Sequence, residues 1–147
     1  MKKLLLKFLF ATVLISGTFF AANAQEFGVR FGDVSGGNIA IDAVFSTYSI
    51  DRIHTDISFG HGVAVDVLWD FIYRPLGDEA LNWYAGVGPY VWFYDPFQLG
   101  AVGEIGVEYL FDAIPVSLSA DWRPAVSVIE ETDFHAGGFG LNIRYIF

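Results

Sequence analysis

The sequence predicts an all-β fold, an eight-stranded antiparallel up-and-down transmembrane β-barrel preceded by a cleavable signal peptide. Three observations predict it. The chain of 147 residues opens like a secretory leader, and the remainder alternates between apolar and polar residues in eight stretches. The 123 residues behind the leader also match the roughly 110–125 that eight strands of about ten residues and seven short connections need.

The expected leader occupies residues 1–24. Its first seven residues carry all three lysines of the chain, an apolar stretch follows, and Ala22-Asn23-Ala24 has the small-x-small pattern of a signal-peptidase site. The uninterrupted apolar part, residues 8–22, is shorter than the roughly 20 residues that a spanning helix needs. We therefore expect export and cleavage before Gln25, without a lipoprotein anchor, because the chain has no cysteine.

Residues 25–147 form the predicted barrel domain. They carry five arginines, no lysine and 17 Asp and Glu residues, a net charge of −12. Such an acidic chain argues against a nucleic-acid partner, because affinity for nucleic acids rests on cationic side chains that meet phosphates. The absence of cysteine also excludes disulfides and thiol chemistry.

The barrel domain contains eight stretches of period-two alternation separated by turn residues. The expected strands are residues 25–32, 38–46, 52–60, 62–73, 81–94, 99–111, 116–128 and 135–147. Because eight is an even number, both chain ends are expected on the periplasmic side of the membrane. Two prolines interrupt this pattern, and each removes a ladder hydrogen bond. We expect a bulge or a strained join at Pro89, which would reverse the side-chain parity beyond it, whereas Pro124 only interrupts its strand.

The two faces of each stretch differ in chemistry. In the last stretch Leu141 and Ile143 share one side, and Asn142 and Arg144 share the other. The apolar face suits lipid, and the other face suits a confined interior in which guanidinium groups pair with carboxylates. The expected lumen charge network comprises Arg30, Asp42, Arg52, His54, Asp56, Asp66, Asp70, Arg74, Glu104, Glu108, Asp121, Arg123 and Arg144. The alternative, a secreted lipocalin-like barrel, would reverse the two faces.

The chain end adds a resemblance. Residues 141–147 end in Phe147 with an aromatic residue, Tyr145, two positions earlier, which looks like the C-terminal assembly signal of outer-membrane barrels. The chain thus resembles the small eight-stranded outer-membrane barrel proteins of Gram-negative bacteria, and residues 81–88 and 118–125 resemble segments of a short, uncharacterised outer-membrane protein family. The resemblance implies a location in the cell outer membrane, contact with outer-membrane lipid and insertion by the barrel assembly machinery, and it brings no catalytic residues.

The expected function is structural or accessory, with a larger envelope complex as a candidate partner. Eight strands leave an interior just wide enough for side chains, so we expect a filled lumen; a narrow channel for ions or small solutes is the alternative. A lipid-modifying enzyme is a third, weaker hypothesis, because the rim residues Ser58 and His61 fall on opposite faces by parity and His135 fits a solvated loop. We expect no enzyme activity, no metal site and no cofactor.

Two further features have competing interpretations. Glu130, Glu131 and Asp133 at the rim fit either a weak Ca²⁺ site or a solvated acidic loop, and the loop is the expectation. Four aromatic residues of lumen parity fit either a stacked aromatic core or a small ligand pocket, and the core is the expectation. They are Tyr84, Tyr90, Trp92 and Tyr94.

Overall fold

The computed structural model describes residues 25–46, 52–129 and 132–147. The expected signal peptide, and the rim acids Glu130 and Glu131, lie outside the described residues. The described chain contains no helix long and apolar enough to cross a membrane.

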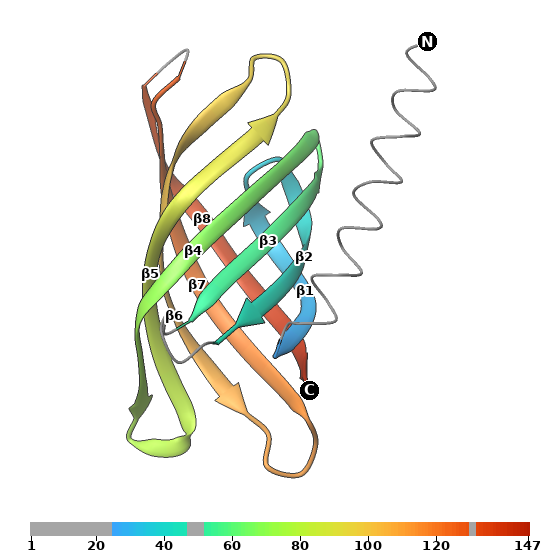
Figure 1. Cartoon of the computed structure of the whole chain (residues 1–147), viewed down its shortest axis with the longest axis vertical. Helices are drawn as coiled ribbons and strands as arrows, with labels where there is room; N and C mark the ends of the chain where they lie inside the picture. The colour runs from blue at the N-terminus through green and yellow to red at the C-terminus, as the bar shows by residue number, and fades with distance from the viewer. Residues whose placement is uncertain (1–24, 47–51, 130–131) are drawn as a thin grey trace.

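The described chain forms a closed antiparallel barrel in which each strand pairs with the next along the sequence and β1 pairs with β8 (Figure 1). The closing pair runs in register from Glu26↔Ile146 to Gly32↔Gly140. The predicted eight-stranded barrel is confirmed, with strand ends within a few residues of those expected. The strands are β1 (Glu26–Val34), β2 (Gly37–Phe45), β3 (Ile53–Gly60), β4 (Gly62–Leu76), β5 (Asp78–Phe93), β6 (Gln98–Leu110), β7 (Val116–Ser127) and β8 (Asp133–Ile146).

The two ends of the barrel carry different connections. The β1–β2, β3–β4, β5–β6 and β7–β8 connections lie at the end drawn uppermost in Figure 1, which we call the upper end. The C-terminus lies at the opposite, lower end, where the β4–β5 and β6–β7 connections also lie. Two of the turns are tight enough to need glycine, because Gly36 and Gly77 both have φ +83°.

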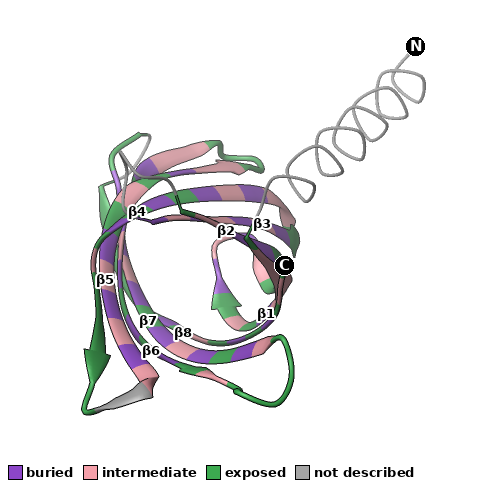
Figure 2. Ribbon diagram, turned by 60° about the horizontal axis from the view of Figure 1, so that its bottom comes forward, coloured by how far each residue is buried: buried purple, intermediate pink, exposed green. Residues whose placement is uncertain are grey.

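The barrel is polar inside and apolar outside. Among the described residues, 28 large hydrophobic side chains are exposed, whereas the buried set contains 18 polar or charged residues and only ten hydrophobic ones. Leu118 and Ile143 are 41% and 50% exposed, and Arg123 and Arg144 are 4% and 1% exposed. Figure 2 shows the resulting alternation of buried and exposed residues along the strands. The two faces of the barrel therefore differ in the way that the alternation predicts.

The prediction of a bulge at Pro89 is wrong. Tyr84 and Tyr90, on either side of it, are both buried, and β5 stays in one register with β6. The β4–β5 pairing omits the pairs around Pro89 and resumes at Trp69↔Val87 in the same register. The missing N–H is therefore absorbed by a local gap in the ladder, without an inserted residue. At Pro124, in contrast, the β7–β8 register does shift.

A shift that reverses parity also lies in β4. Between Asp70↔Gly86 and Ile72↔Ala85 the β4–β5 register changes by one residue, so every later side chain of β4 points to the opposite face. Tyr73 consequently reaches into the lumen and Arg74 is exposed. The assignment of Arg74 to the lumen network was therefore wrong, because the sequence carries no marker of this bulge.

Glycines make room for the large lumen side chains. A Cβ atom at Gly106 would lie 2.5 Å from Cζ of Tyr84 and 2.8 Å from the carbonyl oxygen of Ala120. Gly103, on the outer face of the same strand, has no such neighbour, since a Cβ there would lie 3.8 Å from the nearest atom. The lumen is thus packed to the limit at Gly106, whereas the outer face has room for a Cβ atom at Gly103.

This difference yields a matched test of lumen packing. We expect Gly106→Ala to lower the free energy of unfolding by about 1–3 kcal/mol, because overpacking strains a filled interior, and Gly103→Ala to leave it unchanged or raise it. Urea unfolding of the detergent-refolded protein, followed by far-ultraviolet circular dichroism, measures both. Equal effects of the two substitutions would contradict a tightly filled lumen.

Candidate functional site

The barrel interior gathers the predicted charged residues. Twelve of the thirteen residues expected in the lumen are buried, and Arg74 is the exception. They come from every strand except β5, with Arg52 directly before β3, and occupy inward positions of the alternation. The buried members are Arg30, Asp42, Arg52, His54, Asp56, Asp66, Asp70, Glu104, Glu108, Asp121, Arg123 and Arg144.

The lower part of the lumen is organised around the Glu108 carboxylate. Arg52 donates to both carboxylate oxygens, over 3.1 and 2.8 Å, and Arg144 Nη1 donates to Oε1 over 2.8 Å. The Tyr73 hydroxyl adds a third donor over 2.7 Å. Glu26 faces both guanidinium groups at 3.6 and 3.8 Å. Sequence reasoning missed Tyr73, which the β4 bulge turns inward. It also missed Glu26, the first residue of β1, although Glu26 has the same parity as Arg30.

His54 lies at the middle of the lumen between two carboxylates. Its Nε2 is 2.8 Å from Oδ1 of Asp42, and its Nδ1 is 3.2 Å from Oε1 of Glu104. Arg144 Nε donates to Asp42 over 2.7 Å, and Arg123 Nε donates to Glu104 over 3.1 Å. This cluster joins strands β2, β3, β6, β7 and β8 across the lumen.

Asp121 organises the opposite wall. Arg30 Nη2 donates to its Oδ1 over 2.6 Å. The Tyr84 hydroxyl and the Asn142 amide donate to Oδ2 over 3.2 and 2.7 Å. Residues of β1, β5 and β8 are thereby bonded to one carboxylate on β7, so the network crosslinks the barrel wall.

Acidic groups outnumber cationic ones in this interior. Four arginines and His54 face seven buried carboxyl groups and the half-buried Glu26 in the described chain. Three of the carboxyl groups lie directly opposite one another on neighbouring strands, in the pairs Asp42↔Asp56 and Asp56↔Asp66. Carboxylates in such pairs repel one another unless cations lie between them. Arg144 bonds Asp42 and Arg123 bonds Asp56.

Asp66 is the least satisfied member of this row. It is 3% exposed, its Oδ1 has no hydrogen-bond partner, and the ion pair it makes in the described chain is a long one, 3.9 Å from Arg123 Nη1. That guanidinium nitrogen already donates to Asp56. Asp66 is therefore a buried acidic group with free acceptor capacity.

Two groups of lumen side chains bring metal-type ligand atoms close together. Both contain His54, with Asp42 and Asp56 in one group and Asp70 and Glu104 in the other. However, Nη2 atoms of Arg123 and Arg144 lie 3.1 and 3.0 Å from Nε2 of His54. Guanidinium groups at that distance repel a metal cation strongly in a low-dielectric interior, so the cluster fits ion pairing better than metal binding.

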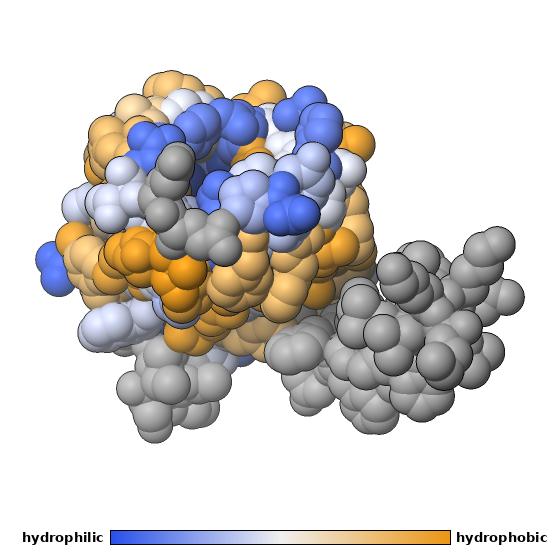
Figure 3. Space-filling model, turned by 90° about the horizontal axis from the view of Figure 1, so that it is seen from above, coloured by the Kyte–Doolittle hydropathy of each residue, from blue (hydrophilic) through white to orange (hydrophobic). Residues whose placement is uncertain are grey.

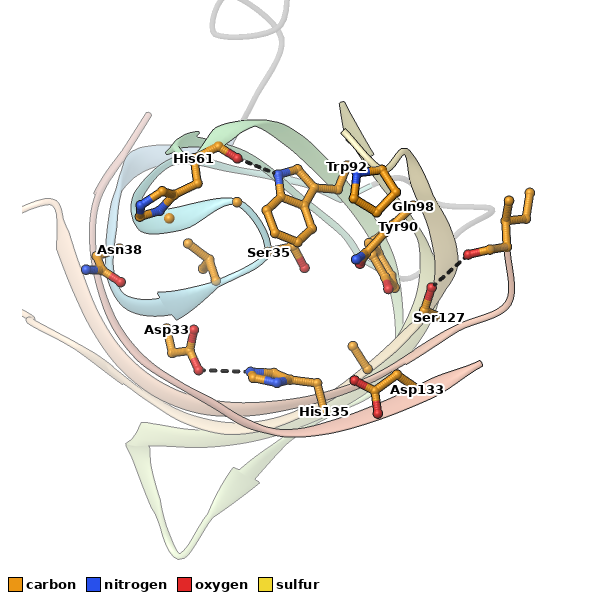
Figure 4. A pocket seen from close by; sticks show the side chains of 16 residues that line it. Asp33, Ser35, Asn38, His61, Tyr90, Trp92, Gln98, Ser127, Asp133 and His135 are labelled. Carbon is orange, nitrogen blue, oxygen red and sulfur yellow. Dashed lines mark hydrogen bonds and ion pairs between the residues drawn. The ribbon is translucent and has the colours of Figure 1, made fainter. Parts of the chain in front are cut away.

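The upper end of the lumen opens into a cavity of about 620 Å³, which we call the vestibule. In Figure 4, Asp33 and His135 lie on one side of it, and His61 and Trp92 lie on the other. His135 Nε2 is 3.0 Å from Oδ2 of Asp33, and the Trp92 indole donates to the His61 carbonyl over 2.8 Å. The described residues that line the vestibule include no arginine or lysine.

The other rim expectations have mixed outcomes. Ser58 is buried and its hydroxyl donates to the Ser35 carbonyl, so in the described chain it is held by backbone. Of the four aromatic residues, Tyr84 and Tyr90 are buried in the lumen, Trp92 lines the vestibule, and Tyr94 is 51% exposed at the rim, stacked on Trp92. The aromatic core is therefore split between the lumen and the vestibule wall.

The expected assembly signal lies on the outer wall beside the closing seam. Tyr145 and Phe147 are 51% and 73% exposed, with ring centroids 5.1 Å apart. Tyr145 pairs with Phe27 of β1 and Val116 of β7. Comparison with known proteins finds no matching family model, curated protein or solved structure.

The network predicts a large loss of stability on substitution of one arginine and almost none on substitution of another, although the sequence alone does not distinguish the two. We expect Arg123→Gln to lower the free energy of unfolding by about 3–5 kcal/mol, because it leaves buried carboxylates without their cation. We expect the exposed Arg74→Gln to change it by less than about 0.5 kcal/mol. Urea unfolding in detergent, followed by tryptophan fluorescence, checks both; a smaller effect at Arg123 than at Arg74 would refute the assigned network.

Proposed function

We propose that this protein is a small integral barrel of the cell outer membrane, exported by its leader, with a side-chain-filled lumen and a structural or accessory role in the envelope. The observation that carries the proposal is the reversal of faces: the charged residues are buried and the hydrophobic ones are exposed. The proposal includes no catalytic activity.

The outer wall supports insertion into lipid. Water-soluble monomers rarely expose contiguous apolar patches larger than a few hundred Å², whereas here exposed hydrophobic residues recur on all eight strands. Figure 3 displays hydrophilic residues around the upper end and hydrophobic residues on the wall below it. Transfer of such a wall from water to hydrocarbon is favourable by roughly 25 cal/mol per Å², and closure leaves no unpaired strand edge to oppose it.

Aromatic side chains near both ends fit the two interfaces of a membrane. Phe93 and Phe97 form a ring contact near the upper end, and Tyr109 and Phe111 form another near the lower end. Aromatic girdles of this kind flank the apolar band of outer-membrane barrels. With the chain ends periplasmic, the lower end faces the periplasm and the vestibule faces the cell exterior.

The proposed partners follow from this placement. Outer-membrane lipid contacts the wall, and the barrel assembly machinery binds the terminal strand with Tyr145 and Phe147 during insertion. A larger envelope complex is the candidate partner of the assembled barrel. The crosslinked lumen favours this accessory role over transport, because eight strands leave little space beyond that filled by side chains.

Substitution of the wall distinguishes lipid from water as its surroundings. We expect Ile105→Arg, in the middle of β6, to destabilise the protein in lipid vesicles by about 2–4 kcal/mol, and Val128→Arg, in the β7–β8 connection, to cost at most about 1 kcal/mol. Both wild-type side chains are exposed, at 49% and 60%. Urea titration in vesicles measures the difference. A water-soluble protein would tolerate both substitutions equally and stay in solution without lipid.

Conductance distinguishes the filled lumen from a channel. We expect the purified protein in planar bilayers to show no steady conductance, because the lumen network closes the path between the ends. Steady, ion-selective openings of the unmodified protein would overturn the sealed lumen and establish the narrow channel in its place.

A further inference from the structure

The vestibule shares part of its lining with a cavity that reaches Asp66. A smaller cavity of about 20 Å³ lies between Asp33, Ser35 and His135, which also line the vestibule, and the deeper residues Asp66 and Arg123. A space of that size holds about one water-sized group. The unpartnered Oδ1 belongs to a residue that lines this small cavity.

The electrostatics of this passage favour a cation. Asp33 and Asp133 line the vestibule together with two histidines, and no arginine or lysine of the described chain does. Beneath them, Asp66 ends a row of three opposed carboxyl groups, in which His54 and Arg144 bond Asp42 and Arg123 bonds Asp56. Arg123 also lines the small cavity, but its Nη1, which donates to Asp56, lies 3.9 Å from Asp66, the one ion pair that Asp66 makes among the described residues. A cation that enters from the upper end therefore meets acidic groups at the rim and a poorly compensated one at the floor.

The size and lining of the vestibule favour an organic cation over a bare metal ion. Its volume of about 620 Å³ is that of a small-molecule site. Trp92 and Tyr90 form aromatic wall, and Val102 and Ala125 supply apolar surface near the floor. Aromatic faces attract cations, and apolar walls suit a methylene chain. The metal-type clusters lie elsewhere, around His54, with guanidinium groups against them.

We propose that the vestibule binds a small aliphatic amine, with its ammonium group on Asp66 and its carbon chain against Trp92. An ammonium group has three donors and is close in size to the water molecule that the small cavity would hold. The second amino group of a diamine lies at the rim, opposite Asp33. The proposal rests on the cavity and its charges alone, so it is independent of the proposed insertion into the membrane.

Calorimetric titration of the refolded protein in non-ionic detergent with 1,4-diaminobutane tests this proposal. We expect saturable binding of one molecule that weakens as NaCl is raised, because exposed charges are screened by salt. The neutral 1,4-butanediol, of the same length, should not bind. Absence of saturable diamine binding, equal binding of the diol, or tighter binding of Ca²⁺ than of the diamine would each overturn the proposal.

Three substitutions locate the site. We expect Asp66→Asn to weaken diamine binding by about tenfold through loss of a charge-assisted hydrogen bond, and Asp33→Asn, at a half-exposed position outside the buried network, to weaken it by about threefold. Asp112→Asn makes the same change in net charge at the lower end, where Asp112 is exposed, and should leave affinity unchanged. An equal effect of Asp112→Asn would show that the diamine is attracted only by the net negative charge of the protein, which would overturn the proposed site. If Asp66→Asn does not fold, Asp33→Asn against Asp112→Asn decides the outcome.

Discussion

Charge pairing in the lumen is the constraint on which the rest of this structure depends. An isolated ion is costly to bury, by several kcal/mol even after relaxation, and this barrel buries four guanidinium groups. It does so by giving each one several acceptors, as when Arg144 bonds both Asp42 and Glu108. These bonds cross the lumen, so they require the wall to be closed. Closure and charge burial therefore stabilise each other, and neither β1 alone nor any single hairpin supplies the partners.

The same constraint accounts for the contrast between the two ends. At the lower end, Arg52, Arg144 and Tyr73 converge on Glu108. Toward the upper end the interior widens into the vestibule, whose described lining includes carboxyl groups but no arginine. An interior that is both hollow and acidic attracts cations, whereas a filled and paired one resists them. The proposed accessory role and the proposed amine site thus belong to different parts of one lumen.

Much of the candidate site was predictable because β-strands alternate strictly. Once the strand limits are known, parity assigns each side chain to a face, which correctly placed Arg123 and Arg144 inside. Parity fails where a residue is inserted, and bulges have no single sequence marker. The prolines marked two positions, yet Pro89 left the register intact, and the shift at Asp70 and Ile72 involves no proline. This one shift accounts for the errors at both Tyr73 and Arg74.

The amino-acid sequence by itself determined the number of strands, their limits to within a few residues, and the chemical character of the two faces, because these depend on neighbours one and two positions apart. Only the tertiary structure decided which charges meet. His54 and Glu104, or Arg30 and Asp121, are far apart in the chain and come together through the stagger of strands around the barrel. The tertiary structure also decided that Asp66 lacks a close partner among the described residues and lies beneath an open vestibule, since both facts depend on side chains contributed by several strands at once.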